Sequence, residues 1–300
     1  MDGAVNIARK AKLSPMVIGI TVIGFGTSAP ELFVSLQAAL AHSPGLSIGN
    51  VVGSNIANIA LILGATAIIV PCATKQFTLK VDMPMMVGAC LLLAIVGMTG
   101  TIGRPAGITA VTILLVFTSW EIRHSRKLQK QQTADSGEAT QKIMPLWKAI
   151  VLSLVSFGLL VLGANVLIKG ASDIAREIGQ QAGTDPRELE RIIGLTIVAV
   201  GTSLPELFAS IMAARKKQAD MAVGNIIGSV TFNILCGIGL TATICPIANS
   251  DRGFLTDYLL MSLLALLLWL FMRTRMLLER WEGLVLLFIY IAYVGYTVVA

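Results

Sequence analysis

Nine apolar runs, each long enough to cross a lipid bilayer, constrain this chain more than any other feature. A membrane span needs about 20 mostly apolar residues. Hydrophobic residues make up 55% of the 300 residues and charged residues only 13%, whereas soluble domains carry roughly 25% charged residues. Because backbone groups inside a bilayer find no water to bond, we expect the runs to be helices of an all-α polytopic membrane protein. They lie near residues 16–41, 48–70, 82–99, 104–122, 147–169, 191–214, 221–247, 256–272 and 281–299.

A hydrophilic stretch divides the chain almost in half. We expect a first half over residues 1–122, a flexible hydrophilic loop over 123–146 and a second half over 147–300. A shorter polar insert, residues 179–190, separates two later spans. The net charge of +6 does not indicate a nucleic-acid-binding protein, since the basic residues of membrane proteins concentrate in cytoplasmic loops.

The two halves contain the same segment twice. Residues 19–64 and 194–239 align without a gap at a constant offset of 175, and 19 of the 46 positions are identical. The identities cluster in GTSxPELFxS, in GNxxGS and at the asparagine that follows. Chance does not place such strings at one fixed offset, so the chain contains an internal duplication.

Positive charge predicts the orientation of the two repeats. If one more span preceded residue 1, the loops on one side would carry 17 of the 23 basic residues, and that side would be cytoplasmic. The cytoplasmic side includes the 123–146 loop, and the C-terminus is then expected on the extracytoplasmic side. We expect the membrane to be a plasma or inner cell membrane. Five spans separate equivalent points of the repeats, so the second is inverted relative to the first. Inverted repeats are typical of alternating-access transporters whose ion site lies at the midplane.

Two carboxylates lie inside apolar spans at equivalent positions, Glu31 and Glu206. A charge at the bilayer centre costs about 2.5–3.5 kcal/mol on insertion scales, so it needs a partner. Neither repeat segment offers a basic residue close to its glutamate. We therefore expect the two carboxylates to converge on cations.

Neighbouring residues supply further oxygen atoms. Pro30 and Pro205 interrupt the helix ladder, and carbonyls freed at membrane depth can coordinate ions. Small-residue spacing at Gly49, Gly53, Gly224 and Gly228 indicates close helix packing. The candidate ligands besides the two glutamates are Thr27, Ser28, Ser54, Asn58 and the Gly24 carbonyl, and their equivalents Thr202, Ser203, Ser229, Asn233 and the Ala199 carbonyl.

The type of ligand limits the choice of ion. Every candidate atom is an oxygen, which suits Ca²⁺, Na⁺ or Mg²⁺ and disfavours zinc or copper. A flexible cage of about 6–8 oxygens favours Ca²⁺ over Mg²⁺. The same oxygens could hold several Na⁺ ions instead, and mutual exclusion at one site is the physical basis of exchange. We expect Cys72, Cys90, Cys236 and Cys245 to be small buried side chains rather than metal ligands or disulfides.

GTSAPE with GNVVGSNIAN, and GTSLPE with GNIIGSVTFN, resemble the two α-repeats of the calcium/cation antiporter superfamily, and most closely those of prokaryotic sodium/calcium exchangers. The resemblance covers most of the chain. It implies a ten-helix inverted-repeat fold in which the second and third helices of each half form the ion site, and it implies that all twelve candidates bind ions. Some exchangers of this family carry Asp at the position of Asn233, so the site here has two formal negative charges rather than three. The resemblance therefore does not fix the number and order of Na⁺ sites.

Alternative functions differ in the chemistry they require. A H⁺/Ca²⁺ antiporter also needs paired glutamates, but the hydroxyl and amide ligands favour Na⁺. An intramembrane enzyme would need a base near Ser28 or Ser203, and neither repeat has His or Lys there. A channel would conduct faster than a conformational cycle allows. We expect Ca²⁺ and Na⁺ to be the transported ions and the lipid bilayer to be the surroundings of the protein. We expect no cofactor and no obligate protein partner.

The beginning of the chain resembles the end of the span that precedes the second repeat. Residues 1–9 match residues 169–176 in part, which leaves the apolar run 147–168 without a counterpart before Met1. We therefore expect one helix of the ten-helix fold to be missing, through a start assigned too late or a shortened chain. The alternative is a natural nine-helix protein.

Overall fold

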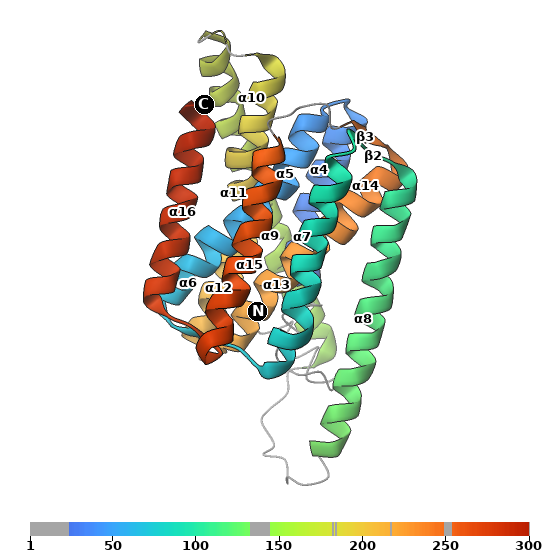
Figure 1. The fold of residues 1–300 in the computed structure, drawn as a ribbon, viewed down its shortest axis with the longest axis vertical. Helices are drawn as coiled ribbons and strands as arrows, with labels where there is room; N and C mark the ends of the chain where they lie inside the picture. Colours follow the sequence, from blue (N-terminus) through green and yellow to red (C-terminus); the bar gives the residue numbers. More distant parts are fainter. Residues whose placement is uncertain are drawn as a thin grey trace.

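The computed structural model describes residues 24–132, 145–181, 183, 185–216, 218–248 and 254–299. Residues 1–23, which carry the start of the predicted span 16–41 and the match used to infer a missing helix, lie outside this part of the chain. So do residues 133–144 of the predicted 123–146 loop. The described residues are almost entirely helical, as the apolar runs predict (Figure 1).

The described part of the first half contains six α-helices, two π-helical segments and two short strands. In chain order they are α3 (Gly24–Thr27), α4 (Ala29–Leu40), α5 (Pro44–Ile56), η2 (Ala57–Leu63), α6 (Gly64–Ile69), β1 (Cys72–Ala73), η3 (Thr78–Asp82), α7 (Met83–Gly97), β2 (Thr101–Ile102) and α8 (Arg104–Gln132). The second half follows the same order after one additional long helix. Its elements are α9 (Leu146–Gln181), α10 (Pro186–Ile193), η4 (Gly194–Val198), α11 (Ala199–Thr202), α12 (Leu204–Arg215), α13 (Ala219–Phe232), η5 (Asn233–Ile238), α14 (Gly239–Ile244), β3 (Ile247–Ala248), α15 (Phe254–Arg275), β4 (Leu277–Leu278) and α16 (Arg280–Val299).

By length and composition, five helices among the described residues can cross a membrane. A bent pair, residues 188–202 with Leu204–Arg215, can form a sixth span with a 42° bend. The five are Pro44–Ile69, Thr78–Gly97, Arg104–His124, Ala219–Ile244 and Phe254–Arg275. The predicted spans 147–169 and 281–299 correspond to α9 and α16. The chain is therefore a multi-pass membrane protein.

One predicted boundary is wrong. The hydrophilic loop does not begin at residue 123, because α8 continues to Gln132. Residues 123–132 contain Arg, Lys, Leu and Gln but neither Gly nor Pro, and such residues favour helix even outside a membrane. The polar insert 179–190 is likewise helical at both ends, since α9 reaches Gln181 and α10 begins at Pro186.

The core is formed by the continuous helices α5–η2–α6 and α13–η5–α14, which are almost fully buried. α8 packs on α14 and α16 packs on α6, along two outer sides of the molecule (Figure 1). α7 packs against its own repeat equivalent, α15. α8 is the repeat equivalent of α16, and α14 is the repeat equivalent of α6. The packing between the two halves therefore follows the sequence duplication.

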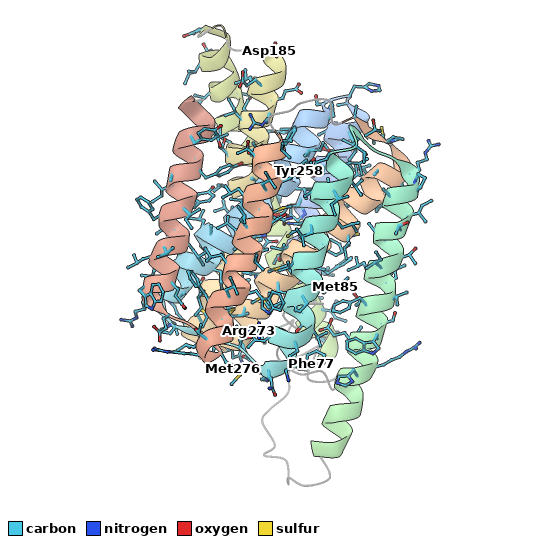
Figure 2. All side chains as sticks on the ribbon, viewed as in Figure 1. Phe77, Met85, Asp185, Tyr258, Arg273 and Met276 are labelled. Carbon is cyan, nitrogen blue, oxygen red and sulfur yellow. The ribbon has the colours of Figure 1, made fainter. Side chains whose placement is uncertain are left out.

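The short strands show how the halves are related in space. β1 pairs antiparallel with β4, and its repeat equivalent β3 pairs with β2. Each two-stranded sheet thus joins the two halves. β2 and β3 lie at one end of the molecule in Figure 1, whereas Met276, which precedes β4, lies at the opposite end in Figure 2. Equivalent strands therefore lie at opposite ends, which is the relation that an inverted repeat requires.

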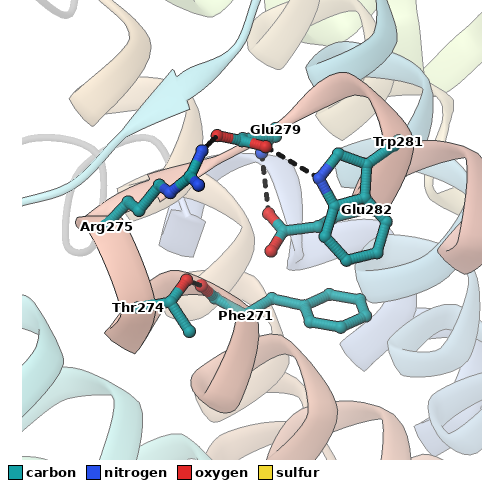
Figure 3. A network of polar contacts seen from close by, with 6 residues as sticks. All are labelled: Phe271, Thr274, Arg275, Glu279, Trp281 and Glu282. Atoms are coloured by element: carbon teal, nitrogen blue, oxygen red, sulfur yellow. Dashed lines mark hydrogen bonds and ion pairs between the residues drawn. The ribbon is translucent and has the colours of Figure 1, made fainter.

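Polar contacts fix the connection between α15 and α16. Trp281 Nε1 donates to Glu279 Oε2 at 2.7 Å, and the Glu279 N–H donates to Glu282 Oε2 at 2.8 Å (Figure 3). Arg275 forms an ion pair with Glu279. The hydrogen bonds from Trp281 and Arg275 lower the pKa of Glu279, which keeps this carboxylate charged. The network holds the turn that presents β4 to β1.

Candidate ion-binding site

A break in one helix of each repeat creates the site. α3 ends at Thr27 and α4 begins at Ala29, and the serine between them, Ser28, has φ −86° and ψ 3°. Ser203 divides α11 from α12 with nearly the same angles, φ −84° and ψ 2°. A proline in the first turn of α4 and of α12 explains the break, because it lacks the N–H that would continue the ladder.

The breaks place the two glutamates at the start of new helices. Glu31 lies in the first turn of α4 and Glu206 in the first turn of α12. Carboxylates are stabilised there by the partial positive charge of the helix N-terminus. Both side chains are completely buried. The local sequence thus places each buried carboxylate at a helix N-terminus, the end of a helix that stabilises negative charge.

Each glutamate is held by the serine of the other half. Ser203 Oγ donates to Glu31 Oε1 at 3.3 Å, and Ser28 Oγ donates to Glu206 Oε1 at 3.1 Å. No lysine or arginine in the described part of the chain pairs with either carboxylate. The predicted convergence of the two repeats on one site is therefore present in the geometry, with two buried carboxylates and no positive side chain among the described residues to balance them.

Hydroxyl groups from both halves surround the carboxylates. Ser229 Oγ donates to Glu206 Oε1 at 3.4 Å and lies 3.5 Å from Thr27 Oγ1. At the equivalent positions, Ser54 Oγ lies 3.2 Å from Thr202 Oγ1. All four hydroxyl side chains are buried. Both hydroxyl pairs join one half to the other, so the hydroxyls predicted from the sequence do come together.

The two predicted asparagines lie on π-helical segments of the buried core. Asn58 is in η2, which packs on α12, and Asn233 begins η5, which packs on α4. A π-turn widens the helix locally and is frequent at functional sites. Asn233 Nδ2 donates to Asn55 Oδ1 at 3.1 Å, whereas the Asn58 side chain has no hydrogen-bond partner among the described residues.

Four buried oxygen atoms of the site lack a hydrogen-bond partner among the described residues. An unsatisfied buried polar group costs about 1–3 kcal/mol, and a charged one costs more. The atoms are Glu31 Oε2, Glu206 Oε2, Asn58 Oδ1 and Asn233 Oδ1. Each comes from a position that the duplication singles out, and each is an acceptor only. Such oxygens are of the type that coordinates hard cations, and the Asn58 Nδ2 donor beside them is also unpartnered among the described residues.

The carbonyls of Gly24 and Ala199 are close to the site, but the helix break does not free them as predicted. The Gly24 carbonyl accepts the backbone N–H of Ser28, and the Ala199 carbonyl accepts that of Ser203, both at 3.1 Å. A helical N–H bonds the carbonyl four residues before it, so the prolines release other carbonyls. The Ala199 carbonyl oxygen also accepts a hydrogen bond from Thr202 Oγ1 at 3.2 Å.

Two further pairs of residues position the site, and neither pair is among the ligands predicted from the sequence. Asn50 Nδ2 donates to the Glu31 carbonyl at 3.0 Å and to Ser35 Oγ at 2.8 Å. Asn225 makes the same two contacts with the Glu206 carbonyl and Ser210 Oγ. The signal was present, because the asparagine of GNxxGS and the last serine of GTSxPELFxS are identical in both repeats.

Close backbone approach brings the two repeats together at the site. A Cβ atom on Gly53 would lie 2.5 Å from the Leu195 carbonyl oxygen and 2.8 Å from Ala199 Cβ. A Cβ on Gly49 would lie 3.2 Å from Gly194 Cα. Glycine is therefore required where α5 crosses η4 and α11, as the small-residue spacing predicts.

The described residues contain no group of three or more His, Cys, Asp or Glu side chains that could hold a metal ion. The four cysteines are free; Cys72 and Cys90 are buried as predicted, whereas Cys236 and Cys245 are only partly buried. The site is an all-oxygen arrangement built mainly from neutral groups around two carboxylates.

Comparisons with known proteins agree with this geometry. Residues 1–123 and 148–299 match the family model described as "Sodium/calcium exchanger protein". The chain is 35% identical to a putative antiporter, CaxA, of Alkalimonas amylolytica, over 97% of this chain and 90% of the relative. It is 30% identical to the sodium/calcium exchanger MaX1 of Methanosarcina acetivorans, over 98% and 91% of the two chains.

A solved structure has the same fold along nearly the whole chain. It is the sodium–calcium exchanger NCX_Mj soaked with Na⁺ and Ca²⁺, with a TM-score of 0.77 and 30% sequence identity, over 98% of this chain and 90% of that one. These relatives are transporters rather than enzymes. The chain therefore belongs to the sodium/calcium exchanger family, within the calcium/cation antiporter superfamily that its two repeats resemble.

Proposed function

We propose that this protein exchanges Ca²⁺ for Na⁺ across the membrane at the site between Glu31 and Glu206. The observation that carries the proposal is the crossed pair of contacts, in which each half holds the glutamate of the other and leaves its second oxygen unpartnered among the described residues. Membership in the exchanger family supports cation exchange that includes Ca²⁺. The ion ligands that we propose are the twelve residues named from the sequence. Gly24 and Ala199 would contribute carbonyl oxygens that also accept a backbone N–H.

The donor atoms suit Ca²⁺ in both charge and number. Two ionised glutamates balance one divalent cation, and the amide oxygens of Asn58 and Asn233 add neutral ligands. Ca²⁺ accepts 6–8 oxygens in flexible geometry, which a mixture of carboxylates, amides, hydroxyls and carbonyls can supply. When Ca²⁺ leaves, the two buried charges need another cation, so release is coupled to binding of the counter-ion.

The hydroxyl pairs support Na⁺ as that counter-ion. Thr27 with Ser229, and Ser54 with Thr202, place neutral oxygens beside each glutamate. Neutral oxygens are useful ligands for Na⁺, whereas a carboxylate that only loads a proton does not need them. Na⁺ and Ca²⁺ would share these atoms and could not occupy them together.

The helix breaks support an alternating-access mechanism. α3–α4 and α11–α12 are each divided at the serine that contacts the opposite glutamate, and both pack against the buried helices α5 and α13. Rocking one half against the other would open the site to each side in turn, as in other inverted-repeat transporters. The positive charge pattern supports a cytoplasmic 123–146 loop and an extracytoplasmic C-terminus in the cell membrane.

Ion flux in proteoliposomes tests the exchange directly. With pH clamped on both sides by buffer and a protonophore, we expect an outward Na⁺ gradient to drive radioactive Ca²⁺ uptake, and equal Na⁺ on both sides to abolish it. Liposomes without protein are the control. Uptake that follows an imposed pH gradient and ignores Na⁺ would instead support H⁺/Ca²⁺ antiport.

Replacement of Asn233 by aspartate should make transport depend more strongly on pH. The change adds a titratable group beside the site without changing its shape. Asn55 faces this position and can turn its amide to donate to the new carboxylate, because its Nδ2 otherwise contacts only Met261 Sδ, at 3.6 Å. We expect Ca²⁺ uptake to persist and its rate to rise with pH as the introduced carboxyl group ionises. Gln37→Glu, which adds a carboxylate at an exposed position of α4, is the matched control.

An unchanged pH–rate profile in the Asn233→Asp variant would contradict this prediction. The profile should be measured as initial Ca²⁺ uptake across a buffered pH series at fixed Na⁺ gradient. A profile altered equally by Gln37→Glu would point to surface charge rather than to the ion site.

A further inference from the structure

The repeat equivalents Asp82 and Asp257 have different partners. Asp257 is buried on α15 and accepts hydrogen bonds from Arg191 Nε and from the Tyr293 hydroxyl, both at 3.0 Å. Arg191 also completes an ion pair with it. At the constant offset of 175, the position equivalent to Arg191 is Met16, which carries no charge. Arg191 thus neutralises this carboxylate in the second half, and no described residue of the first half does the same for Asp82.

Asp82 lies in a buried acidic cluster instead. It ends η3, is 1% exposed, and neither carboxylate oxygen has a hydrogen-bond partner among the described residues. Glu121 of α8 is also 1% exposed, and neither of its oxygens has a hydrogen-bond partner among the described residues. Contacts of Phe77 with Trp120 and His124 bring this turn of α8 against the start of η3. Lys80, on the same short segment, is exposed and forms no ion pair with either carboxylate in this part of the chain.

A third side chain belongs to the cluster. The Thr78 hydroxyl is fully buried one turn before Asp82, near enough to stabilise its charge, and it has no hydrogen-bond partner among the described residues. A buried hydroxyl normally finds a partner. Together the three side chains offer five buried oxygens, all of them able to accept, and no positive group from the described residues beside them.

Aromatic packing fixes this cluster between η3 and α8. Phe77 stacks on Trp120 and on His124, with ring centroids 6.1 and 5.2 Å apart, so the start of η3 is held against α8 on either side of Glu121. Met85 and α8 residues line an apolar cavity of about 420 Å³ beside it. Figure 2 shows Phe77 at the same end of the molecule as Met276. The lining of this space is mostly apolar, and its Thr112 hydroxyl already donates to the Ile108 carbonyl.

We propose that Asp82, Glu121 and Thr78 form a second cation site, which binds a divalent cation such as Ca²⁺ apart from the Glu31–Glu206 site. Two carboxylates balance one divalent charge, and their four oxygens with the Thr78 hydroxyl give five ligands of the hard type that Ca²⁺ prefers. Water completes the coordination. The cation takes the place that Arg191 has beside Asp257 in the other repeat.

Counting bound Ca²⁺ separates this site from the exchange site. Radioactive Ca²⁺ is equilibrated with the purified full chain in Na⁺-free, mildly alkaline buffer, and folding of each variant is checked by gel filtration. We expect two Ca²⁺ per chain in the unmodified protein, one in Glu31→Gln/Glu206→Gln, and none when Asp82→Asn is added. Because asparagine keeps the shape of aspartate, folding should persist, and Glu121→Gln serves as the second variant.

The matched control is Glu279→Gln in the exposed turn after α15, which should leave the count unchanged. Thr78→Val should weaken the residual Ca²⁺ binding by at least about tenfold without removing it, since one neutral ligand is lost. The proposal is overturned if the Glu31→Gln/Glu206→Gln chain binds no Ca²⁺, as it would if Asp82 and Glu121 held protons. It is also overturned if Asp82→Asn and Glu121→Gln leave the residual ion in place. If the Glu31→Gln/Glu206→Gln chain still binds two ions and Asp82→Asn removes one of them, the exchange site is wrong and this one stands.

Discussion

Ca²⁺ transport should be lost when either Glu31 or Glu206 is replaced by glutamine. Each change keeps the shape of the side chain and removes half of the charge that balances Ca²⁺. Removing one partner of a buried charge pair costs about 3–5 kcal/mol, which corresponds to a loss of at least about 100-fold. The serine of the opposite half can still donate to the amide oxygen, so the fold should persist. Initial rates of Na⁺-driven Ca²⁺ uptake measure the effect.

Glu279→Gln provides the control for this pair of variants. It removes a carboxylate from the turn shown in Figure 3, far along the chain from both repeats, and should transport normally. All three proteins should elute as the unmodified protein does in gel filtration. Near-normal uptake by either Glu31→Gln or Glu206→Gln would refute the assignment of the exchange site.

Gly53→Ala should impair both stability and transport, because α5 has no room for a side chain at this position. The added Cβ would lie 2.5 Å from the Leu195 carbonyl oxygen and 2.7 Å from Leu195 Cα, so backbone atoms would have to move. Overpacking of a core typically costs about 1–3 kcal/mol, and backbone contacts yield less readily than side chains. The displaced element is η4–α11, which carries Thr202 toward Ser54.

Gly88→Ala is the matched control, since it makes the same change in the apolar helix α7. A Cβ on Gly88 would meet nothing within 4 Å, and alanine is favoured over glycine in a helix by about 1 kcal/mol. We expect the melting temperature and Ca²⁺ uptake to fall in Gly53→Ala and to be retained in Gly88→Ala. Equal behaviour of the two variants would show that the crossing of α5 and η4 is not tightly packed.

The sequence predicted the architecture of the site well because the determinants are local and repeated. A proline next to a glutamate within an apolar run specifies a broken helix and a buried charge, and the second copy shows that both are retained. Ser28 and Ser203 were therefore expected near the carboxylates. Which glutamate each serine would contact was not predictable, because the crossed pairing depends on how the halves pack rather than on either segment.

Other features depend on contacts that no single segment encodes. The extension of α8 to Gln132 crosses the boundary that hydropathy draws, since helix propensity persists where apolar character ends. The role of Asn50 required the position of the Glu31 carbonyl in space. The π-helical turns at Asn58 and Asn233 depend on packing against α12 and α4, and residue composition alone does not specify them.

The difference between Asp82 and Asp257 illustrates the same limit. Both aspartates are visible in the sequence at the offset of the duplication, yet they lie outside the matched segments. Only the three-dimensional arrangement shows that Arg191 reaches one of them and that Glu121 accompanies the other.

The crossed serine–glutamate contacts also constrain how the two halves can evolve. A substitution at Ser28 is felt by Glu206, and one at Ser203 by Glu31, so selection acts on pairs of positions that belong to different copies of the duplicated segment. Neither copy can lose its motif while the other compensates. For the same reason, a chain with only one copy could build this arrangement only from two subunits, each of which supplies the serine that holds the glutamate of the other.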